Sequence, residues 1–128
     1  MRKGGGKAKG SSFERLICKE LSLWITGGEH QDVFWRSAMS GGRSTVAMKK
    51  GDKLAAQAGD VSSVHILGHA FIDRFTVECK FYKTLNFESF IKGKGNLLGF
   101  WQVAREDSAQ YNKKPILVGK QNQYTIVV

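Results

Sequence analysis

The chain has 128 residues, and its 20 Lys and Arg against 11 Asp and Glu give a formal net charge of +9 at pH 7. This length predicts one domain, and 41% hydrophobic residues suffice for a core. The charge favours a polyanionic partner, nucleic acid before a membrane surface. No apolar run is long enough to span a bilayer and no signal peptide is recognisable, so we expect an intracellular, cytoplasmic protein without membrane contact.

The N-terminal segment differs in composition from the rest of the chain. Residues 1–10 carry four positive charges and no acid, which predicts a flexible basic arm that either contacts phosphate or is simply solvated. Residues 11–128 are then expected to form the single domain. Because the sequence stops inside an apolar run at Val128, we also expect further residues beyond it.

The first regular element is predicted to be an amphipathic helix. From Ser11 to about Thr26, apolar residues recur at three- and four-residue steps and predict one buried stripe, and the Gly-Gly pair that follows would end the helix. The residues of this stripe are Phe13, Leu16, Ile17, Leu21 and Trp24. Ser11 and Glu14 fit a capping box, a structural role that would by itself explain this acid. Glu20 falls near the middle of the predicted apolar face, where it needs a buried partner or belongs to a site.

The middle of the chain is predicted to be mainly strands. Residues 31–37 have the pattern of a short strand, and a Gly/Ser-rich stretch with a basic, weakly helical segment follows. Residues 59–67 predict a strand or a strand pair that turns at Gly68. Residues 70–81 form the strongest predicted strand, because β-branched and aromatic side chains run through it.

The C-terminal third predicts a second helix between strands. A short segment at 87–91 and a flexible Lys/Gly stretch precede an amphipathic helix at about 96–111. Residues 115–118 and 124–128 are two late strands. A helix, several strands, a second helix and two more strands predict a single α/β or α+β domain.

The strongest predicted strand carries the most informative polar residues. Alternation along a strand sends Glu78 and Lys80 to one face and Cys79 to the other. Carboxylates bind hard cations such as Mg²⁺, and a nearby lysine can orient or deprotonate a water. With Glu14 and Asp60 as further carboxylates, this set could cleave a phosphodiester. The alternative is an ordinary solvated edge strand, on which alternating charges are common.

The order of these motifs resembles the PD-(D/E)XK nuclease superfamily, most closely its archaeal-type and phage Holliday junction resolvases. Residues 9–15, Lys-Gly-Ser-Ser-Phe-Glu-Arg, resemble the opening of their first helix. Residues 36–43 resemble their loop with an Arg and a Ser-Gly element. Residues 59–61 and 77–80 resemble the strand-opening Asp and the Glu-x-Lys that closes the next strand. The resemblance covers residues 7–82, and the four motifs in order are more specific than any one alone.

The resemblance implies a fold, an activity and partners. The fold is a restriction-endonuclease-like core, in which helices flank a mixed central β-sheet. The activity is metal-dependent DNA endonuclease, resolving four-way junctions by paired nicks with Mg²⁺, for which Mn²⁺ would substitute. A homodimer would place two sites on the two strands of a symmetric junction.

The resemblance also implies catalytic roles. Glu14, Asp60 and Glu78 would bind one or two metal ions, Glu14 either directly or through water, and Lys80 would position the attacking water. Asp73 competes with Asp60 as the first strand acid because it lies nearer to Glu78 in the sequence, although the Gly-Asp-Val context favours Asp60.

Positively charged residues are the candidate DNA contacts. Arg36 would lie on the scissile phosphate and offset transition-state charge, and Ser40 would lie on a neighbouring phosphate; a solvated loop is the simpler alternative for both. The remaining candidates, which would contact the DNA backbone without sequence preference, are Lys3, Lys7, Lys9, Arg43, Lys49, Lys50 and Lys53.

Two other functions stay open at this point. One is a restriction-like, repair or phage nuclease that cuts linear duplex or other branched DNA. The other is a catalytically silent DNA-binding protein, in which the acids are structural. A cysteine enzyme has little support, because Cys18 and Cys79 are expected to be buried, reduced thiols. Trp35 and Trp101 are expected to pack in the core rather than stack on bases.

Overall fold

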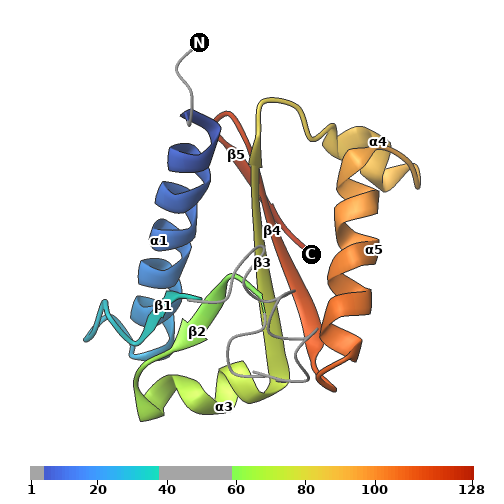
Figure 1. Cartoon of the computed structure of the whole chain (residues 1–128). Helices are drawn as coiled ribbons and strands as arrows, with labels where there is room; N and C mark the ends of the chain where they lie inside the picture. Colours follow the sequence, from blue (N-terminus) through green and yellow to red (C-terminus); the bar gives the residue numbers. More distant parts are fainter. Residues whose placement is uncertain (1–4, 38–58) are drawn as a thin grey trace.

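The chain folds as a mixed β-sheet between helices. The computed structural model describes residues 5–37 and 59–128. Their elements are, in order, α1 (Gly5–Ile25), β1 (Phe34–Arg36), β2 (Val61–Ser63), α3 (Ile66–Arg74), β3 (Phe75–Tyr82), α4 (Phe87–Ile91), α5 (Asn96–Ala109), β4 (Lys114–Gln121) and β5 (Tyr124–Val127). In Figure 1, α1 covers one face of the β3-β4-β5 sheet and α5, with α4, covers the other. The predicted fold class is confirmed.

Asp60 connects the two sheets of the described residues. β3 pairs in parallel with β4, through a crossover that contains α4 and α5, and β4 pairs antiparallel with β5. β1 and β2 form a separate antiparallel pair. The backbone N–H of Asp60 donates to the Val77 carbonyl at 2.7 Å, and the Ser37 N–H donates to the Asp60 carbonyl at 2.9 Å. The residue before β2 therefore lies against the free edge of β3.

The sheet has a hydrophobic core on each face. On the α1 face, Val77 from β3 and Val118 from β4 are buried with Phe13. On the α5 face, Leu117 is buried with Leu97 and Leu85. Neighbouring residues of β4 thus enter opposite cores, as the period-two alternation of a strand requires. Because both faces are covered, a polar side chain on the central strands is at least partly buried.

Helix α1 begins earlier than predicted. It starts at Gly5 rather than Ser11, so the prediction of a flexible arm is wrong for residues 5–10, and Ser11 lies inside the helix instead of capping it. Extending a formed helix costs far less than nucleating one, and the Lys9 ammonium lies 3.9 Å from the centre of the Phe81 ring. This contact with β3 compensates for the poor helix propensity of the glycines. The helix ends at Ile25, close to the predicted end at about Thr26, and Gly27 follows in a turn with φ of +64°.

The buried face of α1 is rotated from the predicted one. Leu16 and Trp24 are 43% and 68% exposed, and Glu20 is exposed too, so its predicted burial is wrong. The acid that faces the core is Glu14, whose side chain is only 15% exposed. The apolar pattern was misleading because this inward face also carries polar residues.

Ser22 is the second inward polar residue of α1, and it fixes β1 against the helix. Its fully buried hydroxyl donates to the Cys18 carbonyl at 2.7 Å and accepts from the backbone N–H of Val33 and Phe34 at 3.1 and 2.9 Å. These bonds satisfy backbone donors at the start of β1. They determine where Arg36, two residues after Phe34, meets the helix.

The predicted strand at 70–81 is half wrong. Residues 66–74 form helix α3, and only from Phe75 does the chain become extended. His65 caps this helix, because its Nδ1 accepts from the Leu67 N–H at 3.1 Å. Ile72 is buried in the core on the α1 face, and Phe71 packs against Trp24 of α1 and Phe34 of β1. Tertiary packing of this apolar face overrides the β-propensity of the individual residues.

The C-terminal half agrees with the predictions from the sequence. Helix α5 and strands β4 and β5 occur at the predicted places, although α5 ends at Ala109 rather than near Tyr111 and β4 is longer than predicted. The segment at 87–91, for which no structure was predicted, is helix α4. No helix within residues 5–37 and 59–128 is long and apolar enough to cross a membrane.

Candidate active site

Strand β3 presents Glu78 and Lys80 on the sheet face that α5 covers. The Lys80 ammonium lies 4.9 Å from the ring centre of Phe100 on α5, whereas Cys79 is buried in the opposite core beside α1. This is the arrangement that strand alternation predicts. A carboxylate and an ammonium group therefore lie together between the sheet and α5.

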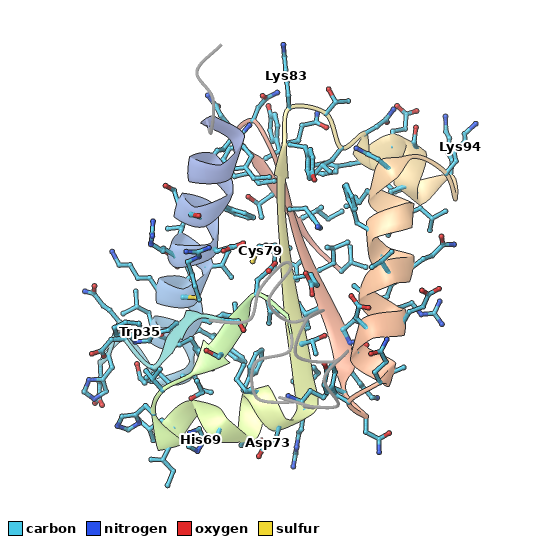
Figure 2. All side chains as sticks on the ribbon, viewed as in Figure 1. Trp35, His69, Asp73, Cys79, Lys83 and Lys94 are labelled. Carbon is cyan, nitrogen blue, oxygen red and sulfur yellow. The ribbon has the colours of Figure 1, made fainter. Side chains whose placement is uncertain are left out.

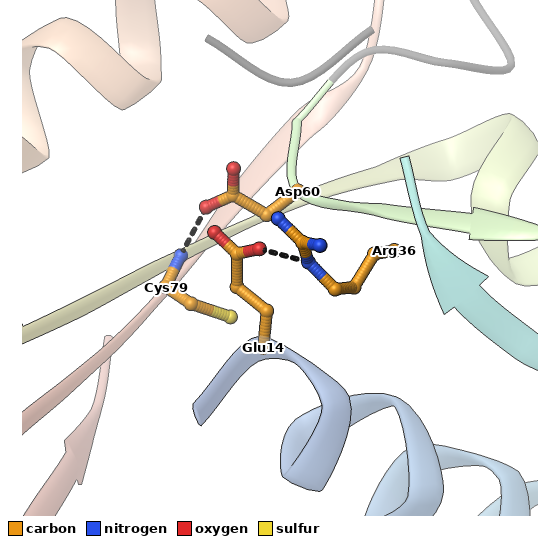
Figure 3. Close-up of polar contacts among 4 residues, drawn as sticks. All are labelled: Glu14, Arg36, Asp60 and Cys79. Atoms are coloured by element: carbon orange, nitrogen blue, oxygen red, sulfur yellow. Dashed lines mark hydrogen bonds and ion pairs between the residues drawn. The ribbon is translucent and has the colours of Figure 1, made fainter. Parts of the chain in front are cut away.

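Asp60 lies at the edge of the same strand. Its backbone N–H bonds to the Val77 carbonyl, and its Oδ2 accepts from the Cys79 N–H at 2.7 Å (Figure 3). These two bonds bracket Glu78 and hold the Asp60 carboxylate beside it. The carboxylate thus occupies a position on the free edge of β3 that a further strand would otherwise fill.

Gly59 makes this approach possible, and its replacement is expected to disturb the site. It has φ of +79°, and a Cβ there would lie 2.8 Å from the Val77 carbonyl oxygen. We expect Gly59→Ala to lower the free energy of unfolding by about 1–3 kcal/mol, because both the backbone conformation and the contact become strained. Urea denaturation measures the loss.

Gly99→Ala is the matched control for this substitution. Gly99 lies within α5, and a Cβ there would meet nothing within 4 Å. The same added methyl group is expected to stabilise the protein by up to about 1 kcal/mol, because alanine favours helix. Equal effects of the two substitutions would contradict the tight approach at Gly59.

Asp73, the competing acid, lies elsewhere. It is exposed on α3 at one end of the molecule, well away from Cys79 (Figure 2), and its charge acts on Lys113 at the start of β4. The structure brings Asp60, rather than Asp73, to Glu78.

Asp60 and Glu78 form a pair of carboxyl groups that are costly to ionise together. Burial is the main cause that raises the pKa of each, to about 8 for Glu78. The Asp60 charge raises the pKa of Glu78 further, and Lys80 opposes this. The Cys79 N–H favours the Asp60 carboxylate, whereas the Glu14 charge disfavours it. In the absence of a cation, one proton is therefore retained near neutral pH, and the two carboxyl groups share a hydrogen bond.

Glu14 approaches this pair from α1, together with Arg36 from β1. The Arg36 Nε donates to Glu14 Oε2 at 2.6 Å, and the two side chains are 33% and 15% exposed. Figure 3 shows the carboxylates of Glu14 and Asp60 pointing toward one another. Arg36 thus compensates the charge of Glu14, the third acid of the site, and its Nε is already hydrogen-bonded to that acid.

Asp107 was missed by the sequence analysis. It lies on α5, and its charge acts on Glu78, while Lys80 acts on Asp107. It follows the buried Ala104 by three residues, so a helical wheel places it beside the inner face. This spacing from Ala104 was visible in the sequence. Only the packing of α5 over β3 shows that Asp107 lies close enough to act on Glu78.

The carboxylate oxygens of Asp60 and Glu78 are suitable ligands for a hard divalent cation. The three predicted ligands, which also include Glu14, are not grouped as one metal-binding set. Within the described residues, no three His, Cys, Asp or Glu side chains are grouped closely enough to hold a metal ion. Asp60 and Glu78 are adjacent carboxyl groups whose mutual repulsion a cation would relieve. Glu14 is bonded to Arg36 instead.

The two cysteines are not suited to nucleophilic or ligand chemistry. Burial, followed by the charge of Glu14, raises the pKa of Cys18 to about 12. Burial also raises the pKa of Cys79 well above its usual value. Both residues are free, buried thiols, so they stay protonated, as expected from the sequence.

Several predicted DNA contacts lie outside the described residues, namely Lys3, Ser40, Arg43, Lys49, Lys50 and Lys53. For Lys7 the structure describes only the backbone, which is helical. Lys9 is described, and it flanks the site from α1 through its contact with Phe81. Their contacts with DNA stay predictions.

A mixed sheet flanked by helices, with an Asp at the edge of a strand that carries Glu-x-Lys, defines the PD-(D/E)XK nuclease fold. A family model described as "Phage putative PDDEXK endonuclease" matches residues 5–128, and the chain belongs to this family. The predicted superfamily is confirmed, while the resolvase branch stays a prediction. Comparison with curated proteins and with solved structures found no match to the chain.

Proposed function

We propose that this protein is a Mg²⁺-dependent DNA endonuclease that cuts branched DNA, with the four-way junction as its preferred substrate. The convergence of Asp60, Glu78 and Lys80 at the free edge of β3 carries the proposal, because a nuclease needs carboxylates and an ammonium group at one point. Membership in a family of phage endonucleases supports the reaction class.

The carboxylates would hold the cation. Asp60 and Glu78 are the ligands, and Glu14 acts through water. A bound Mg²⁺, for which Mn²⁺ would substitute, supplies positive charge to the phosphate oxygens and favours deprotonation of water. Because burial disfavours two ionised carboxyl groups here, cation binding has to displace a proton from the pair.

The two basic residues would act on water and phosphate. The Lys80 ammonium lies against the Phe100 ring, on the strand face that also carries Glu78, so it can donate a hydrogen bond to a water close to the acids. Arg36 bonds Glu14 through Nε, and its terminal nitrogens can offset charge on the phosphate in the transition state. Lys80 would orient the water and Arg36 would bind the phosphate, and neither side chain needs to leave its present position.

A basic groove beside Lys80 would take the DNA backbone. Its volume is about 480 Å³, and Lys9, Lys80 and Lys83 line it together with Tyr82. Three ammonium groups, from α1, from β3 and from the residue after β3, suit successive phosphates. The junction preference and a homodimer with two symmetric sites rest on the resemblance to resolvases.

The test is a cleavage assay on two substrates. End-labelled four-way junction and matched linear duplex are incubated with wild type, Lys80→Ala or Lys94→Ala, in Mg²⁺ or in EDTA. We expect paired symmetric nicks in the junction that require Mg²⁺ and fall at least about a hundredfold in Lys80→Ala. Lys94→Ala is the control, because Lys94 is exposed in the loop between α4 and α5, well away from Cys79 (Figure 2).

Other outcomes would select between the alternatives. Equal cleavage of junction and duplex would keep the endonuclease and reject the junction preference. DNA binding without cleavage in any divalent cation, and without an effect of Asp60→Ala, would leave a catalytically silent DNA-binding protein.

A further inference from the structure

A second groove lies on the other side of the Glu14–Arg36 pair, between α1 and β1. Its volume is about 430 Å³, and Arg15, Lys19, Trp35 and Arg36 line it. Arg36 belongs both to this wall and to the ion pair with Glu14. The groove therefore adjoins the Glu14–Arg36 pair, and of the proposed catalytic residues Arg36 alone lines it.

Trp35 forms an exposed aromatic surface in this groove. Its neighbour Phe34 points into the core and is 2% exposed, whereas Trp35 is 57% exposed, so the expectation that Trp35 packs in the core is wrong. The indole Nε1 donates to the Asp32 carbonyl at 3.2 Å. This bond restrains the ring, so stacking on it would cost little further ordering.

The rest of the groove is positively charged. Arg15 and Lys19 are exposed, and they lie four residues apart on α1, on one face of the helix. Among the described residues that line the groove, Asp32 is the only acid. Two cations beside an aromatic ring are the elements that single-stranded nucleic acid requires, since the base stacks and the phosphates bind the cations.

We propose that this groove binds one unpaired nucleotide of the DNA substrate, with its base stacked on Trp35 and its flanking phosphates on Arg15 and Lys19. The proposal rests on the proposed nuclease function and refines its substrate class. A base inside a duplex has no free face for the indole, whereas a base at a branch point or in a single-stranded arm does. The groove would thus favour branched DNA over plain duplex.

Binding is tested in EDTA, so that cleavage is not needed. Fluorescence anisotropy compares a forked DNA with single-stranded arms against a blunt duplex of the same sequence. Trp35→Ala is expected to weaken binding to the fork about five-fold or more and to leave the blunt duplex unchanged. Trp24→Ala is the control, because Trp24 is also exposed but lies outside the groove. Equal weakening on both DNAs, or none, would overturn the proposal.

Intrinsic fluorescence provides a readout that a folding defect does not mimic. A single-stranded oligonucleotide should quench the emission of wild type and of Trp24→Phe, and the quenching should largely disappear in Trp35→Phe, which retains a stacking ring. In Arg15→Gln/Lys19→Gln, the slope of log K against log salt should fall by about 1.4 for single-stranded DNA. Unchanged quenching in Trp35→Phe would overturn the proposal.

The nuclease function and this groove can fail separately. A protein that cleaves in Mg²⁺ but binds fork and duplex equally with or without Trp35 would refute the groove alone. A protein that shows the Trp35-dependent preference but never cleaves would refute the nuclease alone.

Discussion

Glu78→Gln is expected to make the cation-free protein more stable at pH 8 while it lowers DNA cleavage at least about a hundredfold. Burial raises the pKa of Glu78 to about 8 from an ordinary 4.5. The folded state therefore binds this proton more tightly than the unfolded state does, and the stability of the wild type falls as pH rises from about 4.5 to 8. The amide has no proton to lose, so it escapes this cost.

The expected gain in stability follows from the size of the pKa shift of Glu78. A gain of about 2 kcal/mol or more at pH 8 corresponds to a rise of roughly 5 °C or more in the unfolding temperature. The difference between variant and wild type should shrink as pH falls and become small below about pH 4.5, where the wild-type carboxyl group is increasingly protonated in the unfolded state as well as in the folded state. Thermal unfolding followed by circular dichroism, in EDTA at pH 4 and pH 8, measures both points.

Glu88→Gln serves as the control, because Glu88 is an exposed acid in an ion pair with Lys92. It should change neither stability nor cleavage appreciably. Adding Mg²⁺ at pH 8 should raise the unfolding temperature of the wild type, because the cation binds the ionised pair, and should do so much less in Glu78→Gln. Destabilisation by Glu78→Gln at pH 8 would contradict the assigned environment of this residue.

Arg36→Ala is expected to destabilise the protein by about 2 kcal/mol and to impair cleavage. The substitution leaves the Glu14 carboxylate largely buried and facing Asp60, without the guanidinium that now bonds it at 2.6 Å. Removing one partner of such a pair costs more than the pair itself contributes. Because Arg36 is partly exposed, solvent reduces the effect below that of a fully buried pair.

A double variant separates stability from catalysis at this pair. Glu14→Gln/Arg36→Gln removes both charges, so it should recover much of the lost stability in urea denaturation while cleavage stays low. Lys92→Ala, which breaks the exposed Glu88–Lys92 pair at 3.0 Å, should cost less than about 0.5 kcal/mol. If Arg36→Ala costs no more than Lys92→Ala, the Glu14–Arg36 pair is not the structural element inferred here.

The errors of the sequence analysis share one cause. The pattern on α1 selected Leu16 and Trp24 for the core and flagged Glu20, yet the helix turns Glu14 and Ser22 inward. A hydrophobic pattern finds the buried face only when that face is apolar. Here polar groups bond to β1, so the true face was hidden. The strand prediction at residues 70–74 was also wrong because of tertiary packing. There the packing of α3 prevailed over the β-propensity of the individual residues.

The sequence by itself determined the class of fold and which polar residues share one face of β3. The alternation that brings Glu78 and Lys80 together is a local property of any strand, so residue order suffices to predict it. The tertiary structure alone decided that Asp60, and not Asp73, reaches Glu78, that Arg36 holds Glu14, and that Asp107 lies nearby. These contacts join segments far apart in the chain, and their geometry depends on how α1, β1 and α5 pack on the sheet. No local pattern encodes that packing.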